Sequence, residues 1–337
     1  MGKVNIGVIG VGRIGSMHAR NLKYQVSGVN VLGVADVFEE TAQKVASELE
    51  IPIGEKDYHI LLENKDIDAV IICSSTDTHA QIISEAAQAG KHIFCEKPIA
   101  LDLKKIDEAI TAVEKAGVKL QVGFNRRFDP SFKKAKKMVA EGKIGTPHLV
   151  RISSRDPQPP PISYVRVSGG IFLDMMIHDF DMARYLLDQE VTELMAIGNC
   201  LVDPAIGKAG DIDTAIVSLK YESGALGAID NSRQAVYGYD QRIEIFGSKG
   251  CIVVGNKKPT EVTISGVEDV RNDKPVFFFI ERYTESYLAE MEEFVRCIKE
   301  DTEPQVGGFD GKMAVLMGYA AKESLIKKSF KKVNFDR

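Results

Sequence analysis

The sequence has few cysteines, and no two of them form a C-x-x-C pair. They stand far apart, at Cys73, Cys95, Cys200, Cys251 and Cys297. An odd, scattered set argues against a disulfide framework and against a zinc site built from neighbouring thiols. We therefore expect reduced thiols, a cytoplasmic protein and no bound metal. Tryptophan is also absent, which excludes no class of function.

Long apolar runs and long basic runs are missing as well. No stretch approaches 18 consecutive apolar residues, so we expect neither a transmembrane helix nor a signal peptide, and no membrane partner. The formal net charge is −5, and the short lysine run at 133–137 is typical of a solvated helix face. Nucleic acid is therefore not an expected partner. The length of 337 residues predicts two domains.

A glycine-rich turn lies between the first predicted strand, at 4–9, and the first predicted helix. In that context a G-x-G-x-x-G pattern indicates a dinucleotide site. Its glycines would permit a tight turn, a close approach of a pyrophosphate to the backbone, and close helix–strand packing. The helix N-terminus would then attract the phosphates. The residues of this turn predicted to bind the cofactor are Gly10, Gly12, Arg13, Ile14 and Gly15. A glycine turn without a ligand is the alternative.

An acidic residue, Asp36, ends the next predicted strand, 21 residues after Gly15. Its carboxylate can accept hydrogen bonds from the hydroxyls of an adenosine ribose and would repel a 2′-phosphate. The next residues, Val37 and Phe38, include no arginine that would accommodate NADP. The sequence therefore predicts NAD as cofactor, with NADP as the alternative.

Strands and helices alternate through the rest of the first half, which predicts a doubly wound, mainly parallel α/β sheet over residues 1–123. Further strands are expected at 69–73, 92–95 and 119–122. Ligands bind beyond the carboxyl ends of such strands. Residues 74–79, 96–98 and 124–127 lie there, and those predicted to contact the cofactor are Ser74, Ser75, Thr76, His79, Glu96 and Lys97. A surface lysine in a turn is the alternative for Lys97.

The second half, residues 124–337, predicts an α+β domain with a large open, mostly antiparallel sheet and helices on one face. Strands are expected at 148–154, 191–200, 212–221, 225–231, 240–246, 250–254, 260–265 and 275–280, and closing helices at about 284–300 and 308–328. The last helices are expected within this domain or packed back on the first. An open sheet needs its outer face covered, so we expect a homo-oligomer.

One helical stretch, at 169–181, combines a carboxylate with an imidazole. Asp174 and His178 are four residues apart, so on a continuous helix they lie one turn from each other. A carboxylate there can hold the imidazole in one tautomer and stabilise its protonated form, as a general base requires. A purely structural His–Asp pair is the alternative.

Several motifs resemble the glucose–fructose oxidoreductase/inositol dehydrogenase/rhizopine-catabolism (Gfo/Idh/MocA) family, over essentially the whole chain. They are Gly10–Gly15, Glu96-Lys97-Pro98 and Gly169-Gly170 through His178. The segments 123–129, 154–157 and 235–242 look most like the members that oxidise inositols. The resemblance implies a Rossmann domain, a second domain whose open sheet packs in a homotetramer, and a catalytic set of Lys97, Asp174 and His178. It also implies that Arg127, Asp156 and Tyr237 line a polyol site.

The activity implied is NAD-dependent oxidation of myo-inositol to 2-keto-myo-inositol (scyllo-inosose). His178 would be the base, Asp174 its orienter, and Lys97 the cation that stabilises the developing alkoxide. Arg127 and Asp156 could equally be surface ion pairs. The alternatives are oxidation of scyllo-inositol or an aldose, and a dinucleotide-sensing regulator without turnover. The stereoisomer is left open by the sequence.

Overall fold

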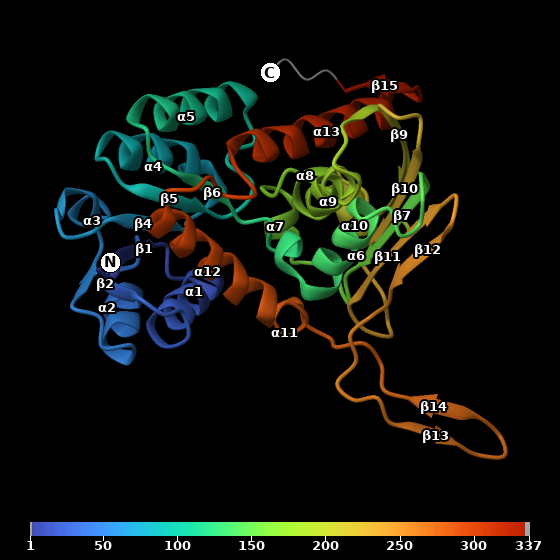
Figure 1. Cartoon of the computed structure of the whole chain (residues 1–337), viewed down its shortest axis with the longest axis horizontal. Coiled ribbons are helices and arrows are strands. Elements are labelled where there is room, and N and C mark those ends of the chain that lie inside the picture. Colours follow the sequence, from blue (N-terminus) through green and yellow to red (C-terminus); the bar gives the residue numbers. More distant parts are fainter. Residues whose placement is uncertain (1, 334–337) are drawn as a thin grey trace. The chain divides into compact units, whose positions relative to one another are not determined.

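The computed structural model describes residues 2–333, which divide into two compact units (Figure 1). The first unit comprises Met1–Phe128 and Glu285–Val315, and the second comprises Asp129–Thr284 and Leu316–Arg337. The first boundary therefore falls after Phe128 rather than after the expected residue 123. The stretch Glu285–Val315 returns to the first unit because its helix contributes apolar side chains to that unit's core.

A six-stranded parallel sheet forms the centre of the first unit, in the order β3-β2-β1-β4-β5-β6. This is the doubly wound order, in which the direction of winding reverses between β1 and β4. The central strands β1 and β4 are buried on both faces, as their continuous apolar runs require. Their bounds are β1 Val4–Ile9, β2 Val29–Ala35, β3 Ile53–Glu55, β4 Ala69–Ile72, β5 His92–Cys95 and β6 Leu120–Val122.

Helices connect these strands and cover the sheet. One core cluster joins β1 and β2 to α1, α2 and α12, and α4 packs against α5. The α5 helix begins directly after Asp102, whose side chain caps it by accepting hydrogen bonds from the Lys104 and Lys105 amides. The bounds are α1 Arg13–Tyr24, α2 Glu39–Glu48, α3 His59–Glu63, α4 Thr76–Gln88, α5 Leu103–Ala116, the 3-10 helix η1 Asn125–Phe128 and α12 Thr284–Glu300.

A seven-stranded sheet dominates the second unit, in the order β12-β11-β7-β10-β9-β8-β15. All neighbours are antiparallel except β7 and β10, so the prediction of a mostly antiparallel sheet is confirmed. Along β9, alternate residues are buried and exposed, which gives the sheet one core face and one open face. The bounds are β7 Pro147–Arg155, β8 Val191–Asn199, β9 Thr214–Tyr221, β10 Leu226–Ser232, β11 Asp240–Gly247, β12 Gly250–Val254 and β15 Lys331–Lys332.

The helices of this unit lie along one face of that sheet (Figure 1). The predicted strand at 275–280 is wrong, because helix α11 begins at Phe279 after an irregular stretch. The apolar run at 276–280 is continuous and short, and such a run fits either type of element. The bounds are α6 Pro130–Ala140, α7 Ile162–Val165, α8 Ile171–Asp174, α9 Ile177–Leu187, α10 Pro204–Lys208, α11 Phe279–Arg282 and α13 Gly308–Lys327, which continues from the first unit into the second.

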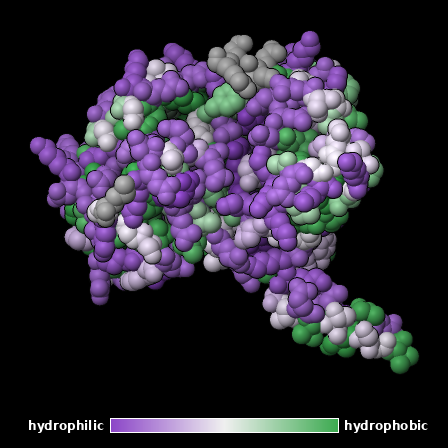
Figure 2. Space-filling model, viewed as in Figure 1, coloured by the Kyte–Doolittle hydropathy of each residue, from purple (hydrophilic) through white to green (hydrophobic). Residues whose placement is uncertain are grey.

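A separate β-hairpin projects from the second unit (Figure 1). It consists of β13 Thr263–Ser265 and β14 Val270–Asn272, so the strand predicted at 260–265 belongs to this hairpin and not to the main sheet. Its side chains are exposed and include Val262, Ile264 and Val267, and Figure 2 shows the resulting apolar colour at its tip. None of the helices within residues 2–333 is long and apolar enough to span a membrane.

Candidate active site

The glycine turn between β1 and α1 is packed as a dinucleotide turn should be. Gly10 has a φ of +84°, and a Cβ there would lie 2.5 Å from the Ser74 amide nitrogen. A Cβ on Gly15 would lie 1.8 Å from the Gly10 carbonyl oxygen, so only glycine allows this approach of helix to strand. Protein contacts therefore explain Gly10 and Gly15. Apart from its own chain neighbours, nothing within residues 2–333 lies within 4 Å of a Cβ on Gly12, whereas a pyrophosphate approaching the backbone would explain a glycine there.

The N-terminus of α1 suits an anionic group. Gly12 caps the helix without a side-chain hydrogen bond, and the first turn, which includes Arg13 and Ile14, contains no acidic residue. The first amides of a helix lack partners within the helix, and its dipole is positive at this end. The residues present therefore fit the phosphates of a dinucleotide.

Asp36 follows β2, at the carboxyl end where its position in the sequence predicts. Its carboxylate accepts hydrogen bonds from the Val11 amide at 2.9 Å and the Phe38 amide at 3.0 Å. These bonds hold the carboxylate beside the glycine turn, and Val37 and Phe38 after it are exposed apolar residues. An acid fixed there fits a ribose diol better than a 2′-phosphate.

The turns after β4 and β5 are tied together by a buried histidine. His79 is fully buried on α4, with Nδ1 2.9 Å from the Pro98 carbonyl oxygen and Nε2 3.0 Å from that of Ser74. The Ser74 hydroxyl also lies 2.7 Å from that of Thr78. Helix α4 begins at Thr76, and Ser75 is its N-cap residue. His79 thus joins the loop after β4 to the loop after β5, and both loops are predicted to contact the cofactor.

Glu96 belongs to a buried cluster with His18 of α1 and Glu290 of α12, all in the first unit. The His18 Nε2 atom lies 3.0 Å from Glu96 Oε1 and 3.8 Å from Glu290 Oε1. The ligand atoms of the three lie within 4.8 Å of one another, which is close enough to share one ion. Burial, and then the charge of Glu96, raise the pKa of Glu290 well above its usual range, which favours the neutral, protonated form of this buried carboxyl.

Lys97 follows Glu96 and is half-buried, in the first unit, whereas Asp174 and His178 belong to the second. Arg127 also lies in the first unit. Its guanidinium pairs with Asp310 at 2.9 Å and donates to the Gln305 carbonyl at 3.0 Å. These contacts give Arg127 a structural role at the start of α13, which the resemblance did not suggest.

Asp174 and His178 do not share one continuous helix, and that expectation is wrong. Asp174 ends α8, and His178 is the second residue of α9. The helical pattern is interrupted at Met175 and Met176, because the Met176 amide donates to the Ile171 carbonyl five residues before it, which also accepts the ordinary bond from Met175. Met175 and Met176 nevertheless keep right-handed helical φ and ψ angles. The spacing of about one turn between Asp174 and His178 therefore survives the break.

Two residues that the sequence analysis did not single out hold the Asp174 carboxylate. Tyr164 of α7 donates its hydroxyl hydrogen to Oδ1 at 2.8 Å, and Arg233 donates from Nη1 to Oδ2 at 3.0 Å. Burial, and then the charge of Asp174, raise the pKa of Tyr164, which keeps it a donor. The predicted pocket residue Asp156 forms an ion pair with the same arginine, with its Oδ2 atom 4.0 Å from Arg233 Nη1.

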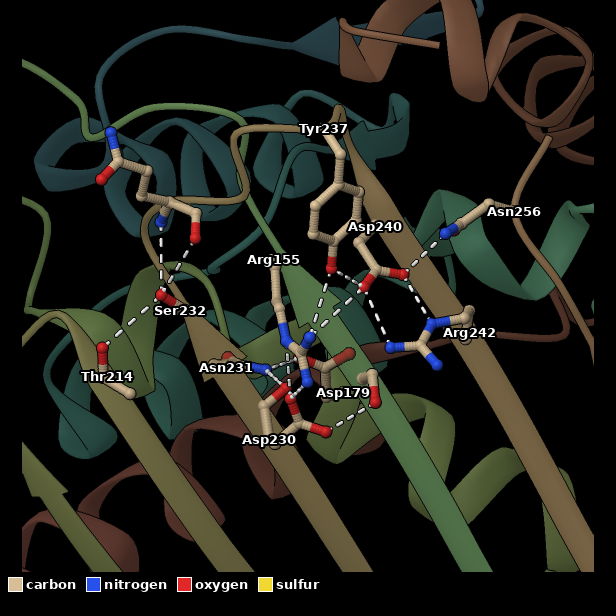
Figure 3. Close-up of polar contacts among 12 residues, drawn as sticks. Arg155, Asp179, Thr214, Asp230, Asn231, Ser232, Tyr237, Asp240, Arg242 and Asn256 are labelled. Atoms are coloured by element: carbon tan, nitrogen blue, oxygen red, sulfur yellow. Dashed lines mark hydrogen bonds and ion pairs between the residues drawn. The ribbon is translucent and has the colours of Figure 1, made fainter. Parts of the chain in front are cut away.

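Tyr237, the last predicted substrate residue, lies in a polar network at the end of β7, β10 and β11 (Figure 3). Its hydroxyl donates to Asp240 Oδ2 at 2.5 Å and accepts from Arg155 Nη1 at 3.2 Å. Burial opposes ionisation of Asp240, but hydrogen bonds from Arg242, Tyr237 and Asn256 outweigh it and lower the pKa of Asp240. Tyr237 is half-exposed, so its ring can still contact a ligand.

Two family models match the chain, one in each half. The model described as an oxidoreductase family with an NAD-binding Rossmann fold matches residues 4–124. The model described as the GFO/IDH/MocA C-terminal domain matches residues 132–253.

Individual relatives cover nearly the full length. The chain is 53% identical to the myo-inositol 2-dehydrogenase of Thermotoga maritima, over 96% of this chain and 97% of that enzyme. It is 43% identical to the inositol 2-dehydrogenase of Rhizobium meliloti, over 96% and 98%. Among solved structures, the scyllo-inositol dehydrogenase of Lactobacillus casei with bound NAD(H) and scyllo-inositol matches with a TM-score of 0.92 and 31% identity, and the match covers 98% of both chains.

Proposed function

The chain belongs to the GFO/IDH/MocA family of NAD-dependent oxidoreductases, and from this premise we propose that it oxidises myo-inositol to 2-keto-myo-inositol. The observation that carries the proposal is the 53% identity to the myo-inositol 2-dehydrogenase of Thermotoga maritima over nearly the whole of both chains. The presence of Lys97, Asp174 and His178 at the family's motif positions supports turnover rather than mere dinucleotide sensing.

The bound NAD supplies the hydride acceptor. The chain's own residues manage the hydroxyl proton and the charge left behind. His178 takes the proton of the reacting hydroxyl, and the Lys97 ammonium stabilises the negative charge that develops on that oxygen. Asp174 orients the imidazole and stabilises its protonated form.

The polyol would be recognised through its several hydroxyls, which need donors and acceptors around the ring. Asp156 and Tyr237 remain the proposed contacts from the second unit. Arg127 is the weakest member of the predicted pocket, because its guanidinium already serves Asp310 and Gln305.

The test is a screen of purified protein for reduction of NAD with myo-inositol, scyllo-inositol, glucose and xylose. We expect myo-inositol to give the highest kcat/KM. The second candidate, scyllo-inositol, is favoured by the likeness to the Lactobacillus casei enzyme that binds it. A preference for scyllo-inositol would change the isomer only, whereas better turnover of an aldose than of every inositol would overturn the proposal.

We also propose a homotetramer assembled through the open face of the second-unit sheet. That face exposes one apolar side chain on each of the strands β8, β9, β10, β11 and β12. They are, in that order, Ile197, Ile216, Leu226, Phe246 and Val253. An apolar face of this kind marks a protein interface. A cytoplasmic location is part of the same proposal, because all five cysteines are free thiols.

A further inference from the structure

A buried arginine stands behind the Asp174 carboxylate in the second unit. Arg233 follows β10, and only 2% of its side chain is exposed. Its Nη1 donates to Asp174 Oδ2 at 3.0 Å, and the carboxylates of Asp156 and Asp211 each lie 4.0 Å from the guanidinium. A guanidinium stays charged at every working pH, and burying it is costly unless carboxylates balance it. Three carboxylates from separate segments therefore share one cation.

The arginine and a tyrosine fix Asp174 from opposite sides. Tyr164 donates to Oδ1, so each carboxylate oxygen has its own donor. Asp211 fixes the helix that carries Asp174, because its carboxylate accepts a hydrogen bond from the Ile171 amide at 3.1 Å, in the first turn of α8. The side chain and the short helix that carries it are thus both anchored through the surroundings of Arg233.

Asp174 ends α8 and His178 is in the first turn of α9, four residues later, so Asp174 is the member of this group nearest to His178 along the chain. An uncompensated carboxylate one turn from an imidazole favours the imidazolium, which cannot accept a hydroxyl proton. The groups gathered around Asp174 and Arg233 are the carboxylates of Asp156 and Asp211 and the neutral hydroxyl of Tyr164, and the guanidinium of Arg233 supplies the positive charge.

We propose that Arg233 is a positioning residue of the oxidation, which fixes the Asp174 carboxylate and offsets its charge so that His178 stays a neutral base at lower pH. This inference rests on the proposed function, since it concerns the same proton transfer. Arg233 acts through Asp174 and is not assigned a contact with the substrate.

The first experiment compares Arg233→Met, Arg233→Lys and the control Arg184→Met. Arg184 is a buried arginine of the same unit that pairs with Glu190 at 2.6 Å. We expect Arg233→Met to lower kcat roughly 10- to 100-fold, a part of the ~10²–10⁴-fold that a general base contributes. The acidic limb of its pH–kcat/KM profile should move to higher pH. Arg233→Lys keeps the charge, so its limb should stay near that of the wild type while kcat falls less.

The control should leave kcat and the acidic limb unchanged, and NAD binding by titration should be the same in all variants. If Arg233 acts through Asp174, the double variant Asp174→Asn/Arg233→Met should be little slower than Asp174→Asn alone. Additive losses, or an Arg233→Met variant with the kcat and limb of the wild type, would overturn the inference. If Arg233→Met does not fold, the kcat of Arg233→Lys decides, and an unchanged value counts against the role.

A second readout does not need turnover. The chain has six histidines, so the ring signal of His178 can be assigned by its loss in His178→Ala and followed by NMR against pH. We expect its titration midpoint to rise in Arg233→Met, and an unmoved midpoint would refute the charge effect. Absence of polyol oxidation by the wild type would instead refute the proposed function, and the NMR titration would still report on Arg233.

Discussion

His178 is the residue on which the proposed proton transfer depends. His178→Ala should lower kcat/KM for myo-inositol by about 10²- to 10⁴-fold, because a positioned base contributes that much. NAD affinity should stay near that of the wild type, since His178 lies in the unit that does not carry the glycine turn. Asp174→Asn should also slow oxidation, and the double variant should be little worse than the worse single one. Steady-state rates give kcat/KM for each variant, and titration with NAD gives its cofactor affinity. Near-full turnover by His178→Ala would show that His178 and Asp174 have only a structural role.

The cofactor preference depends on Asp36. Asp36→Ala should reduce kcat/KM with NAD and narrow the gap to NADP, because it removes both the acceptor for the ribose hydroxyls and the repulsion of a 2′-phosphate. The matched control is Glu40→Ala, an exposed acid in the first turn of α2. Its ratio of kcat/KM between the two cofactors should equal that of the wild type. A wild-type enzyme that prefers NADP would contradict this assignment.

The raised pKa of Glu290 predicts how the free energy of unfolding depends on pH. Burial and Glu96 raise the pKa of Glu290, so folding favours its protonated form. Its stabilising contribution is present below the ordinary carboxyl pKa and is lost as pH rises toward the raised value in the folded protein, at a slope of up to about 1.4 kcal/mol per pH unit. Glu290→Gln mimics the neutral carboxyl and should remove that loss.

Denaturant unfolding of wild type and Glu290→Gln between pH 5 and pH 9 checks this. The difference should grow in favour of the variant as pH rises, while the exposed control Glu292→Gln on the same helix should show no such trend. If the difference in unfolding free energy between the two proteins does not change with pH, Glu290 is ionised in the folded protein. A cation close to His18 and Glu96 would then balance its charge.

At the scale of elements, the short helix α8 is positioned by the residue before it. Gly170 has a φ of +85°, and a Cβ there would lie 2.7 Å from Asp211 Oδ1. Gly170→Ala should destabilise the fold by about 1–3 kcal/mol through strain and should also lower kcat, because Asp211 and the start of α8 must shift.

Gly224→Ala is the matched control for that element. Gly224 has a φ of +86° in the turn between β9 and β10, and a Cβ there would meet no described residue within 4 Å other than its chain neighbours. It should lose a similar stability but keep kcat. Thermal unfolding and steady-state rates separate the two effects, and equal kcat values in the two variants would show that the start of α8 does not position Asp174.

At the scale of the whole molecule, the open sheet face predicts self-association. Sedimentation velocity at micromolar concentration should show a tetramer for the wild type. The variant Ile216→Lys/Leu226→Lys places charges on that face and should dissociate it, whereas Ile60→Lys on α3 of the first unit should not. A stable wild-type monomer would refute the proposed assembly.

The sequence by itself determined the features that arise from local patterns. Apolar runs indicated most of the strands, although not the state of residues 275–280, and the spacing of glycines indicated the turn from Gly10 to Gly15. The side chain of Asp102 sets the start of α5. The acid at Asp36 follows from the same local unit. These features are predictable because periodicity, capping and turn conformation act within a few residues of the chain.

Only the tertiary structure decided which side chains from distant parts of the sequence form ion pairs and hydrogen bonds with one another. Arg233 and Tyr164 reach Asp174 from 59 and 10 residues away, and Arg127 is paired with Asp310 across the first unit. The break between α8 and α9 and the separate hairpin of β13 and β14 also depend on packing outside their own segments. Ion pairs of buried groups are set by which segments the fold brings together, because their energies depend on separation and burial and not on distance along the chain.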